Sequence, residues 1–549
     1  MTTTGVYVVV VVIGVIIVMT VVGCLLTIVA IWIRPDLWKL VNVPLISLSC
    51  ADILFVIFGP AFWIEHFLQP QWKPPGALCS FLGGDSNEIS YNHVHGDPDL
   101  EVRVQDCIFH VHKAVLMETS DYFRAMLESG MRESRENSVQ LQGFTAETFQ
   151  IVLDFLYESK PFKMDDKLAG VLEMAQFLQT RPILDFVKSK LCCENCVHLY
   201  MMADTYVISD LKEAAAHLMG DNYLKFLRSE VFEELREEQR EDVRKTRVRP
   251  QKFLCAVNTG YVTWPETGPR EFMYYDHCKD AWRTFTEIPE QACARGWGVA
   301  VLDNYIYVIG GYGKPRFGHP SGIAVRDVLS DSFCYDPIKN KWFPIRSLGE
   351  ARAYFGAVAH DRSVYAIGGY QYDYTVKTME RYIPEQDRWE FRRSLPGHWT
   401  NYDLAVVCKG DIYINSEEEG TAKFALLKYA SNINQWEILS PLPRKRDKNS
   451  MVAVGETVYL LGGLVPGVDC FNVTTKQWSS LDAHPATDTV EFEKGCTEMD
   501  GTIYVLNSDD MACYIIEAKA WVQGLAGFPG GYHANKAFIA YLPLEQQIV

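Results

Sequence analysis

The sequence predicts a multidomain chain with two transmembrane helices, an α/β domain, a short all-α segment and an all-β domain built from six repeats. Three observations predict this fold class. Two long apolar runs stand within the first 66 residues, residues 97–245 pass from strand-like alternation to helical spacing, and six of the tryptophans after residue 251 recur at intervals of 42–60 residues. A chain of 549 residues is long enough for about three to four domains.

Composition limits the possible classes of function. The net charge is −17 and 22% of the residues are charged. Because phosphate binding needs clustered Lys and Arg, this balance argues against nucleic-acid binding and leaves a basic partner open. The 15 cysteines are an odd number without the regular spacing of a disulfide framework. They indicate reduced thiols in a cytosolic setting.

The amino-terminal segment has the apolar length of a membrane-spanning pair. Residues 5–33 contain no charge, and at about 1.5 Å per residue they exceed the roughly 30 Å of a bilayer core. Residues 41–66 form the second predicted transmembrane helix, and Arg34 and Lys39 lie in the connection. By the positive-inside rule, this connection is cytoplasmic and all that follows the second helix is outside.

Asp52 interrupts the second apolar run. A carboxylate at the middle of a spanning helix costs about 2.5–3.5 kcal/mol on insertion, so Asp52 should face a polar interior. The stretches "NVPLISLSCAD" and "QWKPPGALC" resemble the second helix and first extracellular loop of rhodopsin-like G-protein-coupled receptors, with Asn42, Asp52, Trp72 and Cys79 in the family's positions. Cys24 replaces the family's first-helix Asn, and five further helices are absent. The resemblance therefore implies a receptor-like fragment without a ligand-binding bundle.

Residues 97–190 have the pattern of an α/β domain. "DLEVRVQDCIFHVHKAVL" alternates apolar and polar residues over two short strands and then gives way to helical spacing. With "SDYFRAML", "GMRES" and "VQLQGFTAETFQIVLDFLYE", this region resembles a BTB domain, an α/β dimerisation module. The resemblance implies a homodimer with Asp99 and Lys113 near its interface. The helix that usually precedes the first BTB strand has no convincing counterpart in residues 84–96.

A short motif within this domain implies a partner. BTB adaptors that bind a cullin carry a hydrophobic residue, any residue and then Glu after the "YFRAM" helix, and Met131-Arg132-Glu133 match that order. The resemblance implies contact with a cullin-3 scaffold through Met131 and Glu133. Methionine offers a deformable apolar contact, and a carboxylate accepts strong hydrogen bonds. The alternative is a solvated loop.

Residues 191–245 resemble the start of a BACK domain, followed by a linker. "ENCVHLYMMADTYVISDLKEAAAHLMGDNY" has apolar residues at helical spacing, and Cys193 and Cys196 lack the second pair of a zinc site, so they should pack in a helix. The next stretch, "SEVFEELREEQREDVRKTRVRP", is dense in charge and predicts an exposed helix end or linker. A strand then begins at Lys252, which leaves the second half of a BACK domain missing.

Residues 251–545 repeat. The recurring tryptophans are Trp282, Trp342, Trp389, Trp436, Trp478 and Trp521, and glycine pairs end strands such as "YIYVIGG", "SVYAIGG" and "TVYLLGG". The pattern resembles Kelch repeats and implies a six-bladed β-propeller with four antiparallel strands in each blade. "DIYINSE" and "TIYVLNS" lack the glycine pair and mark degenerate blades. The first blade lacks an innermost strand, so "HANKAFIAYLPL" should supply it and close the ring.

The repeats predict a binding surface rather than an enzyme. The sequence shows no catalytic constellation, no clustered metal ligands and no phosphate-binding loop, so we expect no cofactor. Arg and Tyr dominate interface hot spots, and in Kelch-type adaptors they line a pocket for short peptide segments. The candidate target-binding residues are Arg295, Tyr312, Arg316, Arg326, Arg352, Tyr354, Tyr370 and Tyr402. A long insertion in the second blade, "GYGKPRFGHPSGIAVRDVLSD", is expected to set specificity.

The resemblances together imply a cytoplasmic substrate-recognition adaptor of a cullin-3 RING ubiquitin ligase. BTB would bind the cullin and a second copy, and the propeller would bind an unidentified target protein. One alternative is a cytoskeletal, actin-binding scaffold. Another is a membrane protein with a receptor-like amino terminus, if residues 5–66 span a membrane. A fusion of a receptor exon to an adaptor gene near residue 83 accounts for the mixture and for the missing BACK half.

Overall fold

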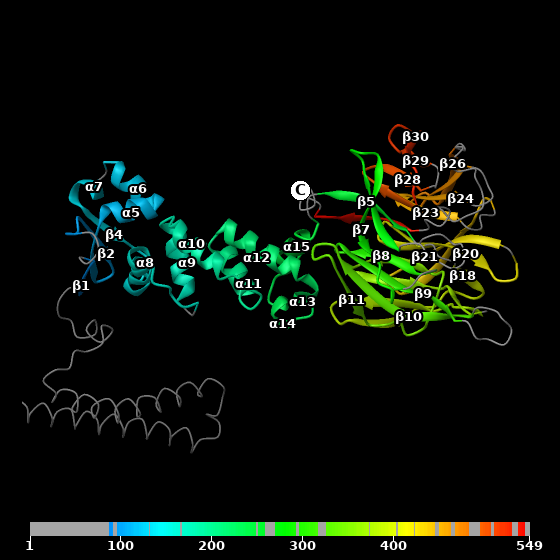
Figure 1. Ribbon diagram of the computed structural model, residues 1–549, viewed down its shortest axis with the longest axis horizontal. Helices are drawn as coiled ribbons and strands as arrows, with labels where there is room; N and C mark the ends of the chain where they lie inside the picture. Colours follow the sequence, from blue (N-terminus) through cyan, green and yellow to red (C-terminus); the bar gives the residue numbers. More distant parts are fainter. Residues whose placement is uncertain are drawn as a thin grey trace, which may run out of the picture. The chain divides into compact units, whose positions relative to one another are not determined.

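The computed structural model (Figure 1) describes residues 87–91, 96–130, 132–164, 167–248, 251–258, 270–292, 296–316, 325–372, 374–401, 405–421, 423–444, 449–462, 467–481, 495–506, 510–529 and 536–543. The two predicted transmembrane helices, with Asp52, lie outside these ranges. None of the helices inside them has both the length and the apolar character needed to cross a membrane. The chain divides into two compact units, one of residues up to Leu116 with Ala125–Phe149, the other of Met117–Arg124 with Gln150 onward.

The first unit contains a four-stranded sheet. Its order is β1 (Asn87–Ser90), β3 (Cys107–Val111), β2 (Leu100–Val104) and β4 (Ser138–Leu141). Strands β2 and β3 are antiparallel, and alternate residues of β2 are buried, which confirms the predicted strand pair. Strand β1 pairs in parallel with β3, so part of the segment that lacked a convincing helix forms an edge strand. Helix α7 (Arg132–Glu136) also belongs to this unit.

Three helices cross the boundary between the units, α5 (Lys113–Thr119), α6 (Asp121–Glu128) and α8 (Ala146–Glu158). The helical part of the second unit continues with α9 (Leu168–Phe177), α10 (Arg181–Ser189), α11 (Cys196–Thr205), α12 (Ser209–Asp221), α13 (Tyr223–Leu227), α14 (Glu230–Glu233) and α15 (Glu237–Lys245). Cys196 is buried at the start of α11, and burial raises the pKa of its thiol to about 12. The Cys196 side chain therefore packs in the helical core.

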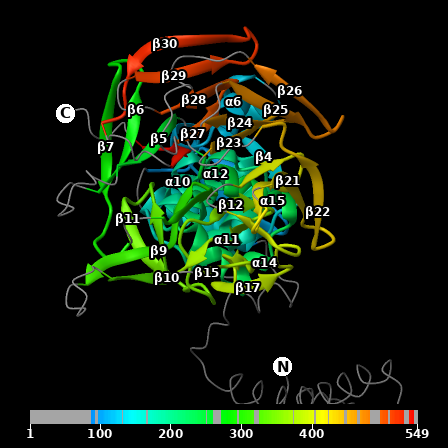
Figure 2. The same ribbon diagram turned by 90° about the vertical axis from the view of Figure 1, so that its right-hand side faces the viewer.

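Six sheets of the second unit are arranged as propeller blades, seen end-on in Figure 2. Blade one contains β31 (Ala537–Tyr541), β5 (Lys252–Asn258), β6 (Glu271–Asp276) and β7 (Ala281–Glu287), and blade two contains β8 (Gly298–Leu302), β9 (Tyr305–Arg316), β10 (Val325–Asp336) and β11 (Lys341–Ile345). Blade three contains β12 (Gly356–His360), β13 (Ser363–Ile367), β16 (Met379–Ile383) and β17 (Arg388–Arg392).

The remaining blades follow the same order, except that the innermost strand of blade four is split. Blade four contains β18 (Trp399–Asn401), β19 (Val406–Cys408), β20 (Asp411–Glu418), β21 (Lys423–Ala430) and β22 (Gln435–Pro441). Blade five contains β23 (Asn449–Val454), β24 (Thr457–Gly462), β25 (Val468–Asn472) and β26 (Gln477–Leu481), and blade six contains β27 (Cys496–Met499), β28 (Thr502–Val505), β29 (Asp510–Ile515) and β30 (Ala520–Ala526). The two segments without glycine pairs thus belong to blades four and six.

The ring closes as the sequence predicts. Strand β31 pairs antiparallel with β5, from Ala537 opposite Ala256 to Tyr541 opposite Lys252. Phe538 and Ala540 enter the core between blades one and two. The last of the described strands therefore completes the first blade and covers the inner edge of β5.

The repeated tryptophans fill the spaces between blades. In each blade the Trp of the outermost strand contacts an aromatic ring of the strand before it; these rings are Tyr275, Tyr335, Tyr382, Tyr429, Phe471 and Tyr514. The indole N–H of Trp342 donates to the carbonyl of Glu287 in blade one, and that of Trp389 donates to Arg346 in blade two. The spacing of these tryptophans therefore gives the number of blades, and their side chains form contacts between neighbouring blades.

Asn434 connects two blades, and its replacement by Ala should lower the free energy of unfolding by about 1–2 kcal/mol. Its side-chain oxygen accepts hydrogen bonds from the Tyr429 hydroxyl at 2.8 Å and from the Arg393 amide of blade three at 3.0 Å. Asn434 also holds a φ of 53°, which Asn adopts more readily than Ala. Urea unfolding followed by tryptophan fluorescence measures the loss. Asn432→Ala, at an exposed position of the same turn, is the matched control, and an equal effect of both changes would contradict the assignment.

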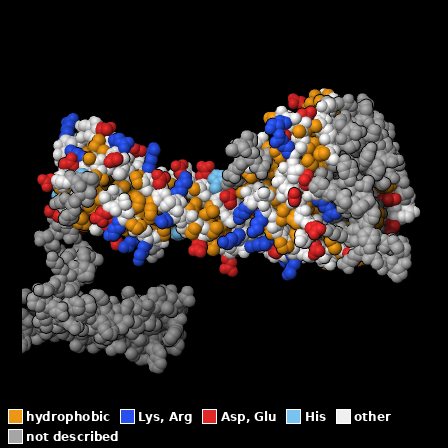
Figure 3. Space-filling model, in the orientation of Figure 1, with side chains coloured by type: hydrophobic (Ala, Val, Ile, Leu, Met, Phe, Trp, Pro, Cys, Tyr) orange, Lys and Arg blue, Asp and Glu red, His pale blue; other side chains and the backbone are white. Residues whose placement is uncertain are grey.

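The charge-dense segment after α13 differs from its prediction as an exposed helix end or linker. The structure shows α13–α15, with the residues that follow them, packed on the turns of blades two and three. Lys and Arg side chains gather at the level of these helices (Figure 3). Arg228 donates to the Pro384 carbonyl at 2.9 Å and to the Tyr382 hydroxyl at 3.0 Å. Arg247 is fully buried and forms an ion pair with Asp336 at 2.9 Å. One apolar core joins these helices to blades two and three.

Candidate functional site

Strand direction separates the two ends of the propeller. The β8–β9 turn at Asp303 and the β12–β13 turn at Arg362 contact the docked helices, because Arg244 pairs with Asp303 at 3.1 Å and Arg362 pairs with Glu237. Strand β9 runs away from the first turn, and β13 runs away from the second. Residues that follow β9 or β13, or that precede β12, therefore lie at the end opposite the docked helices.

Three of the predicted tyrosines come together at that opposite end. Tyr312 lies in the second half of β9, and Tyr354 lies in the connection before β12. Their ring centroids are 5.9 Å apart. Tyr370 starts the β14 strand (Tyr370–Gln371), and its backbone exchanges two hydrogen bonds of 2.8 Å with Ala353, next to Tyr354. Blades two and three thus bring the Tyr312 and Tyr354 rings into contact and hold the Tyr370 backbone next to them. Their contact with a target stays a prediction.

A close backbone approach fixes Tyr354. Its amide donates to the Gly296 carbonyl at 2.6 Å, and its own φ is 49°. Gly296 has a φ of 64°, and a Cβ atom there would lie 3.0 Å from the Tyr354 ring. Glycine is therefore the residue that leaves room for the ring.

The sequence analysis missed two further tyrosines at this end. Strand β14 pairs with β15 (Tyr374–Thr375) in a short hairpin, and Tyr372 and Tyr374 in this hairpin are 51% and 52% exposed. We refer to Tyr312, Tyr354, Tyr370, Tyr372 and Tyr374 as the tyrosine face. The signal in the sequence is "YQYDY", directly after a glycine pair, where a strand ends and a loop begins.

Arg352 does not belong to this face, and its predicted contact with a target is wrong. Its side chain is fully buried and its guanidinium donates to the carbonyls of Gly368 and Thr378 at 3.0 and 2.9 Å. It also forms an ion pair with the buried Glu380 at 2.6 Å. Burial lowers the pKa of the guanidinium, and Glu380 opposes that shift. The Arg352 backbone carbonyl accepts a hydrogen bond from Gly311, so this residue joins blades two and three from inside.

The other predicted propeller residues are only partly described. Arg295 and Tyr402 lie outside the described residues. Arg316 and Arg326 lie on the paired strands β9 and β10, where Val325 is opposite Arg316 and Arg326 is opposite Pro315. The blade-two insertion thus extends a hairpin beyond the blade, at the same end as Tyr312.

The predicted BTB residues lie in the first unit. Glu133 is half-buried in α7, and Met131 lies outside the described residues. Asp99 and Lys113 contact each other within the chain, because the Lys113 amide donates to the Asp99 carboxylate at 2.8 Å. The Lys113 ammonium donates to the side-chain oxygen of Asn137 at 2.5 Å. Both residues therefore have a role inside the domain, and their role in a dimer stays a prediction.

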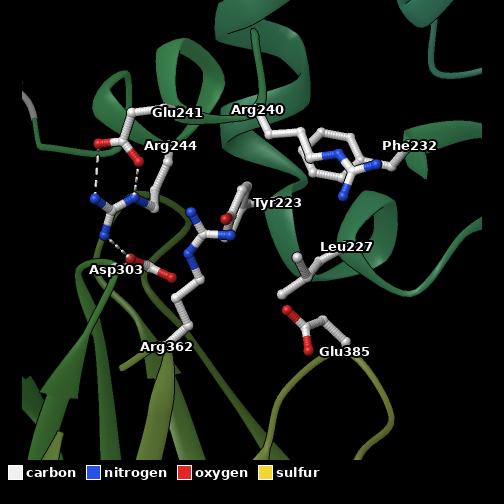
Figure 4. Close-up of a pocket in the computed structure, with 9 residues that line it drawn as sticks. All are labelled: Tyr223, Leu227, Phe232, Arg240, Glu241, Arg244, Asp303, Arg362 and Glu385. Atoms are coloured by element: carbon white, nitrogen blue, oxygen red, sulfur yellow. Dashed lines mark hydrogen bonds and ion pairs between the residues drawn. The ribbon is translucent and has the colours of Figure 1, made fainter. Parts of the chain in front are cut away.

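A pocket lies where the helices dock on the propeller (Figure 4). It encloses about 400 Å³ of space, part of it open to solvent, and its charged lining residues include Arg240, Glu241, Arg244, Asp303, Arg362 and Glu385. Arg244 is held between Glu241 at 2.7 Å and Asp303 at 3.1 Å. Arg362 is paired with Glu237. These charges hold the docked helices in place and leave the pocket without an excess of positive charge for an anion.

The described ranges were also compared with the ligand sets of metal sites. Within them, no group of three or more His, Cys, Asp or Glu side chains could hold a metal ion. Burial also raises the pKa of the Cys255 and Cys496 thiols, the latter to about 12, which disfavours their reactive thiolate forms.

Comparison with known families agrees with this architecture. Residues 95–195 match the BTB/POZ domain, and residues 295–349 and 351–396 match the Kelch motif. The chain carries a BTB domain and a Kelch propeller. Neither match reaches the amino-terminal segment, so the receptor-like resemblance found there has no support from them.

Curated relatives carry Kelch in their names, and one of them names a BTB domain as well. "Kelch repeat and BTB domain-containing protein 13" of Homo sapiens is 27% identical over 78% of this chain and 92% of its own length. "Kelch-like protein 42" of Mus musculus is 28% identical over 81% of this chain and 98% of its own length, and "Kelch-like protein 26" of Danio rerio is 25% identical over 74% and 83%. These similarities support a BTB-Kelch protein.

Proposed function

We propose that this protein is a substrate-recognition adaptor of a cullin-3 RING ubiquitin ligase. Its BTB domain binds the cullin and a second copy of the chain, and its propeller binds a target protein. The observation that carries the proposal is the combination of a BTB domain with a propeller whose tyrosine face lies opposite the docked helices. The adaptor works in the cytosol, and the chemistry of ubiquitin transfer belongs to its partner enzymes.

The tyrosine face supports the target-binding part of the proposal. Tyrosine provides a large contact area and a hydroxyl group with little loss of side-chain entropy. Tyr372 and Tyr374 each leave about half of their surface available, and the Tyr312 and Tyr354 rings contact each other beside them. A target held there is kept at high effective concentration near a ubiquitin carrier, which is how an adaptor without catalytic groups accelerates transfer.

The cullin contact is tested by a double substitution, Met131→Ala with Glu133→Ala. We expect co-purification of cullin-3 with the full-length chain to fall by about 30-fold, the effect of losing a hot-spot contact of about 2 kcal/mol. Arg135→Ala, an exposed position on the same short helix α7, is the matched control and should leave cullin binding unchanged. Unchanged cullin recovery with the double variant would contradict the assignment of these two residues. The absence of cullin from the wild-type protein would contradict the adaptor function itself.

A further inference from the structure

Asn304 joins three separate parts of the second unit. It lies in the β8–β9 turn of blade two with 4% of its surface exposed and a φ of 57°. Its side-chain oxygen accepts a hydrogen bond from the Tyr541 amide at 2.9 Å, and its side-chain N–H donates to the Tyr541 carbonyl at 2.9 Å. The same amide group donates to the Arg247 carbonyl at 3.2 Å. One side chain therefore holds both the ring-closing strand β31 and the segment that follows α15.

Arg247 anchors that segment on the propeller. Its buried guanidinium donates to Asp336 of blade two at 2.9 Å, to the Asp303 carbonyl at 2.7 Å and to the Gly220 carbonyl of α12 at 2.9 Å. It also lies 3.6 Å from the centre of the Tyr305 ring. The backbone at Arg247 is thereby fixed on one side by its own side chain and on the other by Asn304.

We propose that Asn304 is a latch that couples closure of the propeller ring to docking of helices α13–α15 and the segment after them. If β31 separates, Asn304 loses two of its three hydrogen bonds while its amide stays in a buried site. A partly satisfied buried amide is costly, and its remaining hold on the Arg247 carbonyl weakens. When α15 separates from the propeller instead, Asn304 loses its hydrogen bond to the Arg247 carbonyl, and its hold on Tyr541 weakens in the same way. Because coupling free energies are reciprocal, each event makes the other easier.

The latch has a consequence for the whole propeller. The first strand of the propeller follows the docked segment directly, and the last strand pairs with that first strand. Both ends of the propeller chain are therefore secured at one place. A chain whose helices have not docked would hold its ring less tightly closed, so docking and closure form one cooperative step.

The coupling can be measured by hydrogen exchange with mass spectrometry on the full-length protein. Phe538→Ala loosens β31, because Phe538 is buried in the core between blades one and two. We expect faster exchange in β31 and β5, and also an increase of about 5-fold in α15, the lower end of typical coupling between sites. In an Asn304→Ala background, the same Phe538→Ala change should still loosen β31 but no longer alter α15.

Two further variants separate the latch from general loosening. Asn304→Asp keeps the acceptor for the Tyr541 amide and loses the donor to Arg247, so it should also abolish the transmitted effect; it replaces Asn304→Ala if that variant does not fold. Lys339→Ala removes a docking hydrogen bond to Asn222 of 2.8 Å away from Asn304 and should leave the transmission intact. The proposal is overturned if Phe538→Ala leaves α15 unchanged in the wild-type background, or if its effect on α15 persists without the Asn304 side chain.

Discussion

Replacing Arg352 with methionine should lower the free energy of unfolding of the propeller by about 3–5 kcal/mol, the usual cost of breaking a buried ion pair. The substitution removes the partner of the buried Glu380 carboxylate and the side-chain donor to the Gly368 carbonyl. The Thr378 carbonyl also loses its bond from Arg352 but keeps the one from the Gly368 amide. Glu380 keeps its bonds from the amides of Gly349 and Glu350, which lessens but does not remove the cost. The loss should therefore appear as instability of the blade two–blade three junction.

Urea unfolding followed by tryptophan fluorescence measures this loss, since the indoles lie between the blades. Arg388→Met is the matched control, because Arg388 lies on the outer strand of blade three with about half of its side chain exposed. We expect the control to keep wild-type stability. If Arg352→Met also kept wild-type stability and lost only the capture of target proteins, Arg352 would be assigned to the binding surface instead.

Arg352 and Tyr354 show what the sequence can and cannot predict about the site. Both stand in one short connection, and both are residue types typical of interfaces. The difference between them depends on Glu380, 28 residues further along the chain, which the fold brings under Arg352. A local pattern therefore predicts that the connection reaches the propeller end, but it cannot predict which side chain turns inward.

The architecture could be predicted because its signals are local and repeated. The tryptophan period gives the six blades, and the incomplete first blade with a spare last strand gives the ring closure. The docked linker could not be predicted, because the charges of its sequence indicate solvent. Arg247 bonds Asp336 across 89 residues and the Asp303 carbonyl across 56 residues. Only the assembled turns of blade two provide those partners, and they convert an apparently solvated segment into a buried contact.

Replacing Arg247 with methionine should likewise destabilise the second unit by about 3–5 kcal/mol, because Asp336 would remain as a buried carboxylate without its ion-pair partner. The carbonyls of Asp303 and Gly220 would also lose their donor, and Tyr305 would lose the cation over its ring. Lys245→Met is the matched control, since Lys245 is exposed in α15, two residues earlier, and pairs only weakly with Asp242 at 3.9 Å. Thermal unfolding and urea unfolding of both variants measure the difference.

The double variant Arg247→Met with Asp336→Leu separates the missing charge partner from the lost packing. Replacing both members of a buried ion pair with apolar residues is often nearly neutral, so the double variant should recover a large part of the stability that the single variant loses. Asp336 also accepts a hydrogen bond from the amide of Ile338 in the following turn, which limits the recovery. If the double variant were as unstable as the sum of the two single variants, the ion pair would not be the source of the effect. Recovery would instead show that the unpaired Asp336 carboxylate, and not the lost packing of Arg247, causes most of the destabilisation in the single variant.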